Sequence, residues 1–353
     1  MKFTTIAGIL ALSGLAGCAK NAPSATTNSS RSQQTATTSV SAAVTAAASS
    51  FAYGSDVSWV TQMEASGYKF YNNSGTQQDL FTVLSGKGIN AIRLRVWVNP
   101  SGGWCNITDV VTKALRAKAA GMSILIDFHY SDTWADPGHQ TVPAAWASLS
   151  FTDLMTTTYN YTLGALNTLK SNGITPTWVQ VGNETSNGML WPDGEASLNM
   201  KQFAWLVNCG YNATKAIFPS CKVIVHLANG YDNTTFRWLF DGLKANSGSW
   251  DICGMSLYPS ASNWSTYNTE CLANMNDMVS RYGKQVMICE AGFPVNDPTD
   301  AEAFLKDLIA KTKSVSGGLG VFYWEPECYN NWQGYGSGAF GSNGEPTAAM
   351  NAF

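Results

Sequence analysis

Apolar residues are concentrated in short runs that alternate along the chain with longer segments of helical spacing. The runs are rich in β-branched and aromatic residues, as buried strands are. They occupy residues 53–58, 90–98, 123–129, 177–183, 222–227, 252–258, 285–290 and 320–324. Residues 110–120 and 301–312 are two of the helical segments. Eight strand and helix units within residues 51–353 predict an α/β fold, a single (β/α)8 or TIM barrel.

Glycines mark the places where predicted helices give way to strands. Gly88, Gly121 and Gly173 each follow a helical segment and precede an apolar run. This is the C′ position, where a chain leaves its helix in the left-handed conformation. In such barrels the active site forms at the carboxyl ends of the strands, so the residues that end each run are the candidates for chemistry.

The beginning of the chain has the features of an export signal. The apolar stretch from Ile6 to Leu15 is too short to span a bilayer and is typical of a signal peptide. It ends in Leu-Ala-Gly-Cys at residues 15–18, which resembles a bacterial lipobox. The resemblance predicts a lipoprotein signal peptide at residues 1–17 and a lipid on Cys18. The protein is then secreted across the inner membrane and anchored to a membrane at the bacterial cell envelope or cell surface; a cleaved signal peptide without lipid is the alternative.

A polar segment separates this signal from the rest of the chain. Residues 19–50 are mostly Ser, Thr, Ala, Asn and Gln without an aromatic residue, so residues 18–50 are predicted to be a flexible linker headed by the lipidated Cys18. Lys2, Lys20 and Arg31 are the only charged residues before residue 51, which leaves 18 basic and 24 acidic side chains in residues 51–353. This acidic balance argues against nucleic acid as a partner.

The eight cysteines and three histidines do not form a recognisable metal motif. Seven cysteines remain besides Cys18, so they cannot all pair. Cys209 and Cys221 flank a short helix-to-strand segment and could bridge, whereas Cys253 and Cys289 lie in predicted strands and are expected to be small buried residues. The sequence contains no C-x-x-C, H-x-H or H-E-x-x-H motif, so no metal is predicted.

Two glutamates stand where predicted strands end. The fourth strand leads into Asn183-Glu184, and the seventh ends in Glu290. Strands four and seven lie on opposite sides of an eight-stranded barrel, so both carboxyl groups face its mouth. A retaining glycosidase needs two carboxyl groups ~5–5.5 Å apart, one to protonate the leaving oxygen and one to attack the anomeric carbon. The alternative for either glutamate alone is a helix cap or an ordinary ion pair.

At these residues the sequence resembles a known clan. Asn183-Glu184, Glu290, Arg93, Tyr258 and Trp324 are similar to the site of the retaining β-glycanases built on TIM barrels. Within that clan, five segments resemble glycoside hydrolase family 53, the endo-β-1,4-galactanases. These segments are residues 54–59, 92–100, 127–138, 180–184 and 289–294, and the resemblance extends from Tyr53 to Phe353.

The resemblance implies a role for each residue at the catalytic centre. Glu184 would be the acid/base, with a raised pKa, and Glu290 the ionised nucleophile. Arg93 and Tyr258 would both lower the pKa of Glu290, and Asn183 would hold the 2-hydroxyl of the sugar in the −1 subsite. For Arg93 the alternative is a structural ion pair, and for Tyr258 an ordinary core ring.

Residues in the predicted loops would complete the substrate site. His129 lies beside Asp127, which suggests a metal, but the resemblance places His129 at the floor of the −1 subsite. The rings of Trp97, Trp134 and Trp324 would stack on sugars. For Trp191 and Trp332 two roles are open: stacking on sugars, or packing that only fixes the loops. Asp132 and Asp136 either bind sugar hydroxyls or brace their loop.

The resemblance implies an enzyme without a cofactor. Some bacterial members hold calcium between the last two βα loops, but residues 295–300 are short and interrupted by Pro298, which does not support a calcium site. We therefore predict a monomeric endo-β-1,4-galactanase that cleaves galactan side chains of pectin with retention and releases galacto-oligosaccharides. The alternatives are a glycanase of the same clan acting on xylan, mannan or glucan, and a surface lipoprotein that binds glycans without cleaving them.

Overall fold

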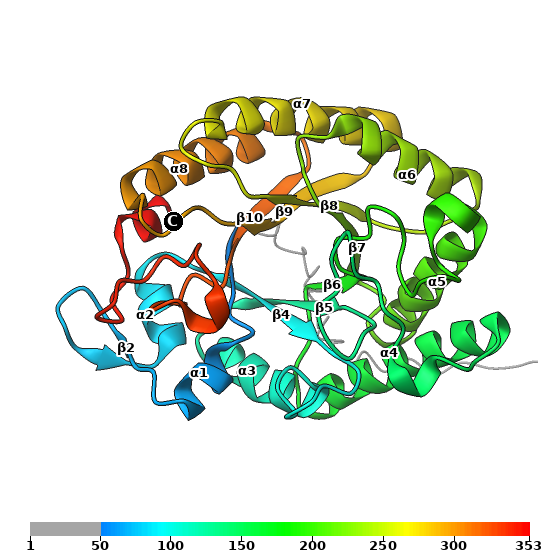
Figure 1. Ribbon diagram of the computed structural model, residues 1–353, viewed down its shortest axis with the longest axis horizontal. Coiled ribbons are helices and arrows are strands. Elements are labelled where there is room, and N and C mark those ends of the chain that lie inside the picture. Colours follow the sequence, from blue (N-terminus) through cyan, green and yellow to red (C-terminus); the bar gives the residue numbers. More distant parts are fainter. Residues whose placement is uncertain (1–50) are drawn as a thin grey trace, which may run out of the picture. The chain divides into compact units, whose positions relative to one another are not determined.

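The structure is a computed structural model that describes residues 51–353. The predicted signal peptide (residues 1–17), Cys18 and the linker (residues 18–50) lie outside the described residues. Parallel strands form one closed barrel in the order β1-β10-β9-β8-β7-β6-β5-β4, and helices surround it (Figure 1). The predicted TIM barrel is therefore confirmed.

Every predicted strand is present, with ends that differ from the prediction by at most two residues. The barrel strands are β1 (Ala52–Asp56), β4 (Ala91–Val96), β5 (Ser123–Phe128), β6 (Trp178–Val181), β7 (Lys222–Leu227), β8 (Ile252–Leu257), β9 (Gln285–Ala291) and β10 (Gly318–Trp324). A two-stranded hairpin, β2 (Phe70–Tyr71) with β3 (Gln77–Gln78), was not predicted. Its strands are too short to show an alternating pattern.

The helices follow the strands as expected for βα units. They are α1 (Val60–Ala65), α2 (Leu80–Gly86), α3 (Ile107–Ala119), α4 (Phe151–Ser171), α5 (Ala196–Ile217), α6 (Asn233–Ala245), α7 (Trp264–Tyr282) and α8 (Pro298–Ser314). Helix α3 shows why such segments are helical: the side chain of Asn106 caps its first turn by accepting from the Asp109 N–H, and Gly121 follows its last turn with φ +73°. Gly88 and Gly173 have the same left-handed conformation after α2 and α4, as predicted.

The barrel interior is apolar at the amino ends of the strands and polar at the carboxyl ends. The apolar layer consists of inward-facing residues from all eight strands: Ala52, Ala91, Leu125, Trp178, Ile224, Ile252, Met287, Cys289 and Phe322. Gly54 leaves room for one of these rings, because a Cβ there would lie 2.2 Å from Cδ1 of Phe322. Side chains alternate between the two faces of a strand, so the next inward positions lie above this layer, and they are polar.

The cysteines of the described part are all free. Cys209 and Cys221 do not form the bridge that their spacing suggested. The Cys221 thiol instead contacts the carbonyl oxygen of Thr177, the residue before β6, at 3.5 Å. Cys253 and Cys289 are fully buried in the core, as predicted.

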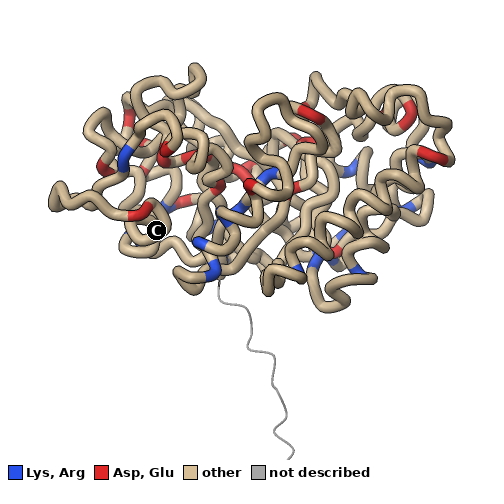
Figure 2. Tube along the Cα trace, turned by 90° about the horizontal axis from the view of Figure 1, so that it is seen from below, with Lys and Arg blue, Asp and Glu red and all other residues tan. Residues whose placement is uncertain are grey.

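The surface of the barrel carries mixed charge. Basic and acidic residues are interspersed along the chain of residues 51–353 (Figure 2), and several form ion pairs between or within helices, such as Arg237 with Asp277 and Arg281 with Asp241. Within the same residues, no helix combines the length and the apolar character that crossing a bilayer requires.

Candidate active site

Glu290 reaches the barrel interior because β9 contains a bulge. Ile288 pairs with Met255 and Glu290 with Ser256, so Cys289 has no counterpart on β8, and the pairing of β9 with β10 is irregular at the same place. Cys289 already faces the apolar layer. In a regular strand the next residue would therefore face the helices. The extra residue turns the Glu290 side chain toward the barrel mouth.

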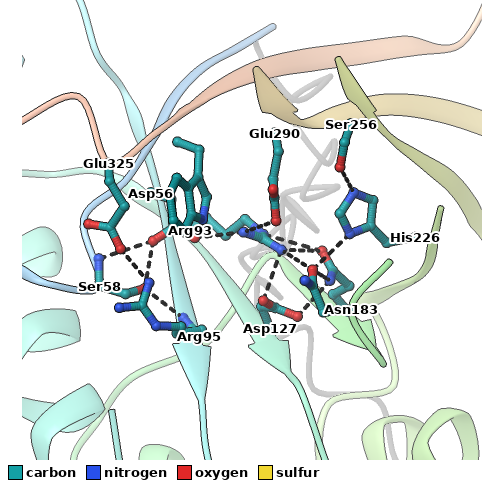
Figure 3. Close-up of polar contacts among 12 residues, drawn as sticks. Asp56, Ser58, Arg93, Arg95, Asp127, Asn183, His226, Ser256, Glu290 and Glu325 are labelled. Carbon is teal, nitrogen blue, oxygen red and sulfur yellow. Dashed lines mark hydrogen bonds and ion pairs between the residues drawn. The ribbon is translucent and has the colours of Figure 1, made fainter. Parts of the chain in front are cut away.

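The guanidinium of Arg93 is the centre of the polar layer (Figure 3). It is fully buried on β4 and contacts Asp56 at 2.7 Å, Asp127 at 2.8 Å, Glu290 at 2.9 Å and Asn183 at 2.8 Å. Burial alone would lower its pKa, but the surrounding carboxylates raise the pKa well above the ordinary arginine value. A permanent positive charge is thus shared by three acids, of which only Glu290 borders the cavity at the mouth.

Glu184 lies on the opposite side of the same cavity. It follows β6 in the left-handed conformation, with φ +45°, two residues after Gly182, whose φ is +78°. These two residues turn the chain so that the Glu184 side chain is partly exposed at the strand end. The cavity has a volume of about 240 Å³ and is lined by His129, Trp134, Ala135, Asp136, Asn183, Glu184, Tyr258, Glu290 and Trp324.

The surroundings of the two glutamates differ in charge. Burial, followed by the negative charge of Glu290, raises the pKa of Glu184 to about 8. Burial also raises the pKa of Glu290 above its ordinary value. Arg93 and Tyr258 do act in the predicted direction, because both counteract the effect of burial on Glu290. Arg93 forms its ion pair with Glu290, so Glu184 is the group that carries the proton.

Tyr258 provides the second contact to Glu290. Its hydroxyl donates to Oε2 of Glu290 at 2.7 Å, while Arg93 occupies Oε1. The tyrosine ring is 42% exposed, so it is a wall of the cavity and not an ordinary core ring.

His129 connects the aromatic residues to the buried acids. Its Nδ1 accepts from the indole N–H of Trp97 at 3.2 Å and from the backbone N–H of Ala135 at 3.3 Å. The proton of the neutral ring is therefore on Nε2, which donates to Asp127 at 2.9 Å. Both ring nitrogens of His129 are thus engaged by protein groups.

A wall of tryptophans continues from the cavity. The rings of Trp59, Trp97, Trp134 and Trp324 line a neighbouring cavity of about 490 Å³, and Trp134 and Trp324 border both cavities. Trp59 contacts both of these rings edge-on. The buried guanidinium of Arg95 lies behind the wall, 4.5–5.1 Å from three of the ring centres. Arg95 is paired with Glu325, so this cation holds the rings from inside the barrel.

Most of the predicted residues are brought together. Glu184, Glu290, Asn183, His129, Tyr258, Trp134, Trp324 and Asp136 line the first cavity, Trp97 lines the second, and Arg93 lies beneath. Asp132 borders neither cavity; its carboxylate accepts from the Ala144 N–H at 2.9 Å and braces the loop. Trp191 and Trp332 are likewise outside: the Trp191 indole donates to Asn187 O at 2.9 Å, and Trp332 packs on Tyr68.

Several residues of the site were not predicted. They are Asp56, Asp127, Gln180, His226 and Ser256 in the polar layer, and Trp59, Arg95 and Glu325 at the aromatic wall. The signal in the sequence was the alternation of side chains along each strand. Arg93 and Arg95 share one face of β4. Asp127 on β5 and Gln180 on β6 lie on the same face of their strands as the apolar interior residues. Buried charged residues on an inward face mark a functional layer.

No metal set is present in residues 51–353, where no three His, Cys, Asp or Glu side chains converge suitably. The loop considered for calcium leads into α8, with Asn296, Asp297 and Asp300 exposed. These side chains do not fit the six or more converging oxygens that calcium requires.

Comparisons with known proteins agree with this geometry. The model of the family described as Glycosyl hydrolase family 53 matches residues 52–353. The arabinogalactan endo-β-1,4-galactanase of Thermothelomyces thermophilus is 37% identical, with 79% of this chain and 90% of that protein covered. A solved structure from a study of two fungal β-1,4-galactanases has a TM-score of 0.80 at 33% identity, covering 86% of this chain and 99% of the other. The GH53 catalytic domain of Ignisphaera aggregans has a TM-score of 0.77 at 30% identity, covering 86% and 95%.

The contact of Tyr258 with Glu290 predicts a shift in titration. In Tyr258→Phe the hydroxyl that stabilises the carboxylate is lost, so the pKa of Glu290 should rise by about half to one pH unit. Carboxyl ¹³C NMR of glutamate-labelled protein measures this, with Glu290→Gln for assignment. Both titration midpoints are followed, because the two glutamates are coupled. Tyr329→Phe is the control, since that hydroxyl donates to Lys69 O outside the site. A midpoint that stays or falls would contradict the assignment.

Proposed function

The chain belongs to glycosyl hydrolase family 53, and from this premise we propose that it is an endo-β-1,4-galactanase that cleaves galactan side chains of pectin with retention. The observation that carries the proposal is the pair of glutamates in one cavity, of which only Glu290 is paired with Arg93. Galactanase relatives that cover most of the chain support the polymer.

In the first step Glu290 acts as the nucleophile. Its carboxylate oxygen forms a bond to the anomeric carbon of the sugar in the −1 subsite while the glycosidic C–O bond breaks. The proton of Glu184 passes to the leaving oxygen, so the departing chain leaves as an alcohol. Both carboxyl groups thereby exchange their charge states: Glu290 becomes a neutral ester, and Glu184 becomes a carboxylate.

In the second step water replaces the departed chain. Glu184 takes a proton from the water while the water oxygen bonds to the anomeric carbon, and the bond between that carbon and Glu290 breaks. Glu290 is again a carboxylate beside Arg93, and Glu184 is again protonated. Two inversions at the same carbon give net retention and release galacto-oligosaccharides.

Neighbouring groups would hold the sugar during both steps. One hydrogen of the Asn183 amide donates to Ala135 O at 2.8 Å, which leaves the second for the 2-hydroxyl of the sugar. Trp324 and Trp134 lie between the two cavities, where the flat faces of galactosyl units would stack.

The polymer preference is testable with a panel of substrates. We expect new reducing ends from β-1,4-galactan and none at a comparable rate from xylan, mannan or β-glucan, because the walls of the cavity, and not the shared carboxyl pair, select the polymer. Product length by chromatography distinguishes internal cleavage from removal of terminal units. Activity on xylan without activity on galactan would overturn the choice of polymer.

Substitution of each glutamate separates its role. Glu184→Ala should lower kcat on galactan about 10²–10⁴-fold and much less on an aryl galactoside with a good leaving group, which needs no protonation for the first step. Azide should rescue the Glu184→Ala variant and form a β-galactosyl azide.

Glu290→Ala should abolish cleavage while leaving the affinity for galactan unchanged. Glu302→Gln is the matched control, because Glu302 forms an ion pair with Lys306 at the surface. Binding by the wild type without any cleavage would favour a glycan-binding lipoprotein instead.

We also propose that the full chain is secreted and lipid-anchored through Cys18. The Leu-Ala-Gly-Cys sequence at residues 15–18 supports this. Expressed in a bacterium, the full chain should enter the detergent phase of Triton X-114, and Cys18→Ser should not. Cys209→Ser, a free thiol in the barrel, is the control. A wild-type chain that is processed but stays in the aqueous phase would show that the signal peptide is cleaved without lipidation.

A further inference from the structure

Basic and acidic residues alternate along the chain but are segregated between the two ends of the barrel. One end, the amino face, consists of the segments that run from the last turn of the helix before a barrel strand to the first residue of that strand. These segments contain eleven basic residues and one acidic residue, Asp251. The basic residues are Lys87, Arg116, Lys118, Lys170, Lys215, Lys222, Lys244, Arg281, Lys284, Lys311 and Lys313.

The opposite end, the carboxyl face, has the reverse charge. It consists of the loops that follow the barrel strands, at residues 57–59, 97–106, 129–150, 182–195, 228–232, 258–263, 292–297 and 325–347, and both cavities lie there. These loops contain no Lys or Arg and ten acidic residues: Asp132, Asp136, Glu184, Asp193, Glu195, Asp232, Asp297, Glu325, Glu327 and Glu345. In Figure 2, Lys and Arg are more frequent in the lower part of the molecule, and Asp and Glu in the upper part.

The dipoles of the helices account for only part of this segregation. Cations stabilise the last turn of a helix, and eight of the eleven basic residues lie in such a turn. Lys87, Lys222 and Lys284 lie beyond the last turn, where the effect of the dipole has fallen off. The dipole also does not explain why the segments contain a single acidic residue.

Most of the positive charge on the amino face is not compensated by ion pairs. Arg116, Lys215, Arg281 and Lys311 are paired with acidic side chains. The other seven, all lysines, have no acidic partner within 4.0 Å among residues 51–353, and five of these are exposed: Lys118, Lys170, Lys222, Lys244 and Lys313. Because residues 51–353 hold 18 basic and 24 acidic side chains, this positive surface does not follow from composition.

The chain enters the barrel on the same face. Phe51, the first described residue, directly precedes β1, and Nζ of Lys313 lies 5.0 Å from the centre of its ring. Residues 18–50 join Cys18 to this point, and 33 extended residues span at most roughly 110 Å. A membrane that holds Cys18 is therefore within reach of the amino face, and the distribution of charge decides which face turns toward it.

We propose that the amino face of the barrel binds the anionic surface of the membrane that carries the anchor, so that the acidic mouth is directed away from the membrane and toward the polysaccharide. Each lysine near an anionic lipid surface strengthens binding about five-fold, and the acidic loops of the carboxyl face are repelled. The arrangement on the membrane rests on the proposed lipid anchor at Cys18, whereas the affinity of the amino face for anionic lipid does not.

The first experiment tests the amino face without the anchor. Residues 51–353 contain the closed barrel and both of its apolar clusters, so this segment is used alone, with its fold verified by circular dichroism. Co-sedimentation is measured with vesicles of phosphatidylcholine, pure or mixed equally with phosphatidylglycerol. We expect binding to the mixed vesicles only, and its loss in about 0.5 M NaCl, which screens charges beyond a few ångströms. Absence of binding at low salt would overturn the proposal, also if the segment binds the acidic polysaccharide polygalacturonate instead.

Two triple variants of equal net charge locate the contact. Lys170→Gln, Lys222→Gln and Lys244→Gln together should lower the partition coefficient on mixed vesicles about 100-fold. The control replaces Lys69, Lys201 and Lys306, which are exposed lysines outside the amino face, by Gln and should bind within about three-fold of the wild type. None of the six lysines lines either cavity, so both variants should keep the activity on galactan. Equal losses of binding would overturn the proposal, because net charge and not this face would then govern the contact.

The full chain, processed and lipidated, tests the orientation. It is reconstituted in the two kinds of vesicle, its amines are acetylated, and the rate at each lysine is followed by mass spectrometry. Lys170, Lys222 and Lys244 should react several-fold more slowly on mixed vesicles than on phosphatidylcholine, while Lys69 and Lys201 react at the same rate on both. Equal rates on both vesicles at every lysine would overturn the orientation. Failure of the anchor is a separate result, because the chain would then stay out of the Triton X-114 phase while residues 51–353 still bind mixed vesicles.

Discussion

The buried guanidinium of Arg93 is the interaction on which the site depends. A cation inside a barrel is tolerated only if enough acceptors surround it, and Arg93 has Asp56, Asp127 and Glu290 within 2.9 Å. Because the site holds more acids than bases, the carboxyl group that lies far from this cation keeps its proton. The same charge thus distinguishes the two glutamates, because it favours the ionised form of Glu290 beside it and leaves the proton on Glu184, as the proposed mechanism requires.

The two layers of the barrel interior explain why such a cluster is stable. Below it, Trp178, Phe322 and other apolar side chains fill the barrel and exclude water, which strengthens each contact of the polar layer. Above it, the tryptophan wall is held from behind by Arg95. The chemistry therefore lies on a packed base and not in a channel, as in other barrels of this class.

The fold was predictable because each strand is an apolar run that ends at a polar residue. Glu184, Glu290 and Arg93 were found from those ends and from the family resemblance. Three partners of Arg93, namely Asp56, Asp127 and Gln180, were missed because they come from three different strands, and no local pattern shows which inward positions meet across a barrel. The β2–β3 hairpin is too short to leave a pattern, and the spacing of Cys209 and Cys221 carried no information on where their thiols point.

The bulge in β9 has a consequence for comparing and redesigning such barrels. One inserted residue decides whether position 290 faces the cavity at the barrel mouth or the surrounding helices. An alignment that follows hydrophobic periodicity alone would place the proposed nucleophile one residue away, on Cys289. A designed barrel that copies the amino acids but builds a regular strand would carry the correct glutamate on the wrong face. The position of this carboxyl group therefore depends on the number of residues in β9 as much as on the amino acid at position 290.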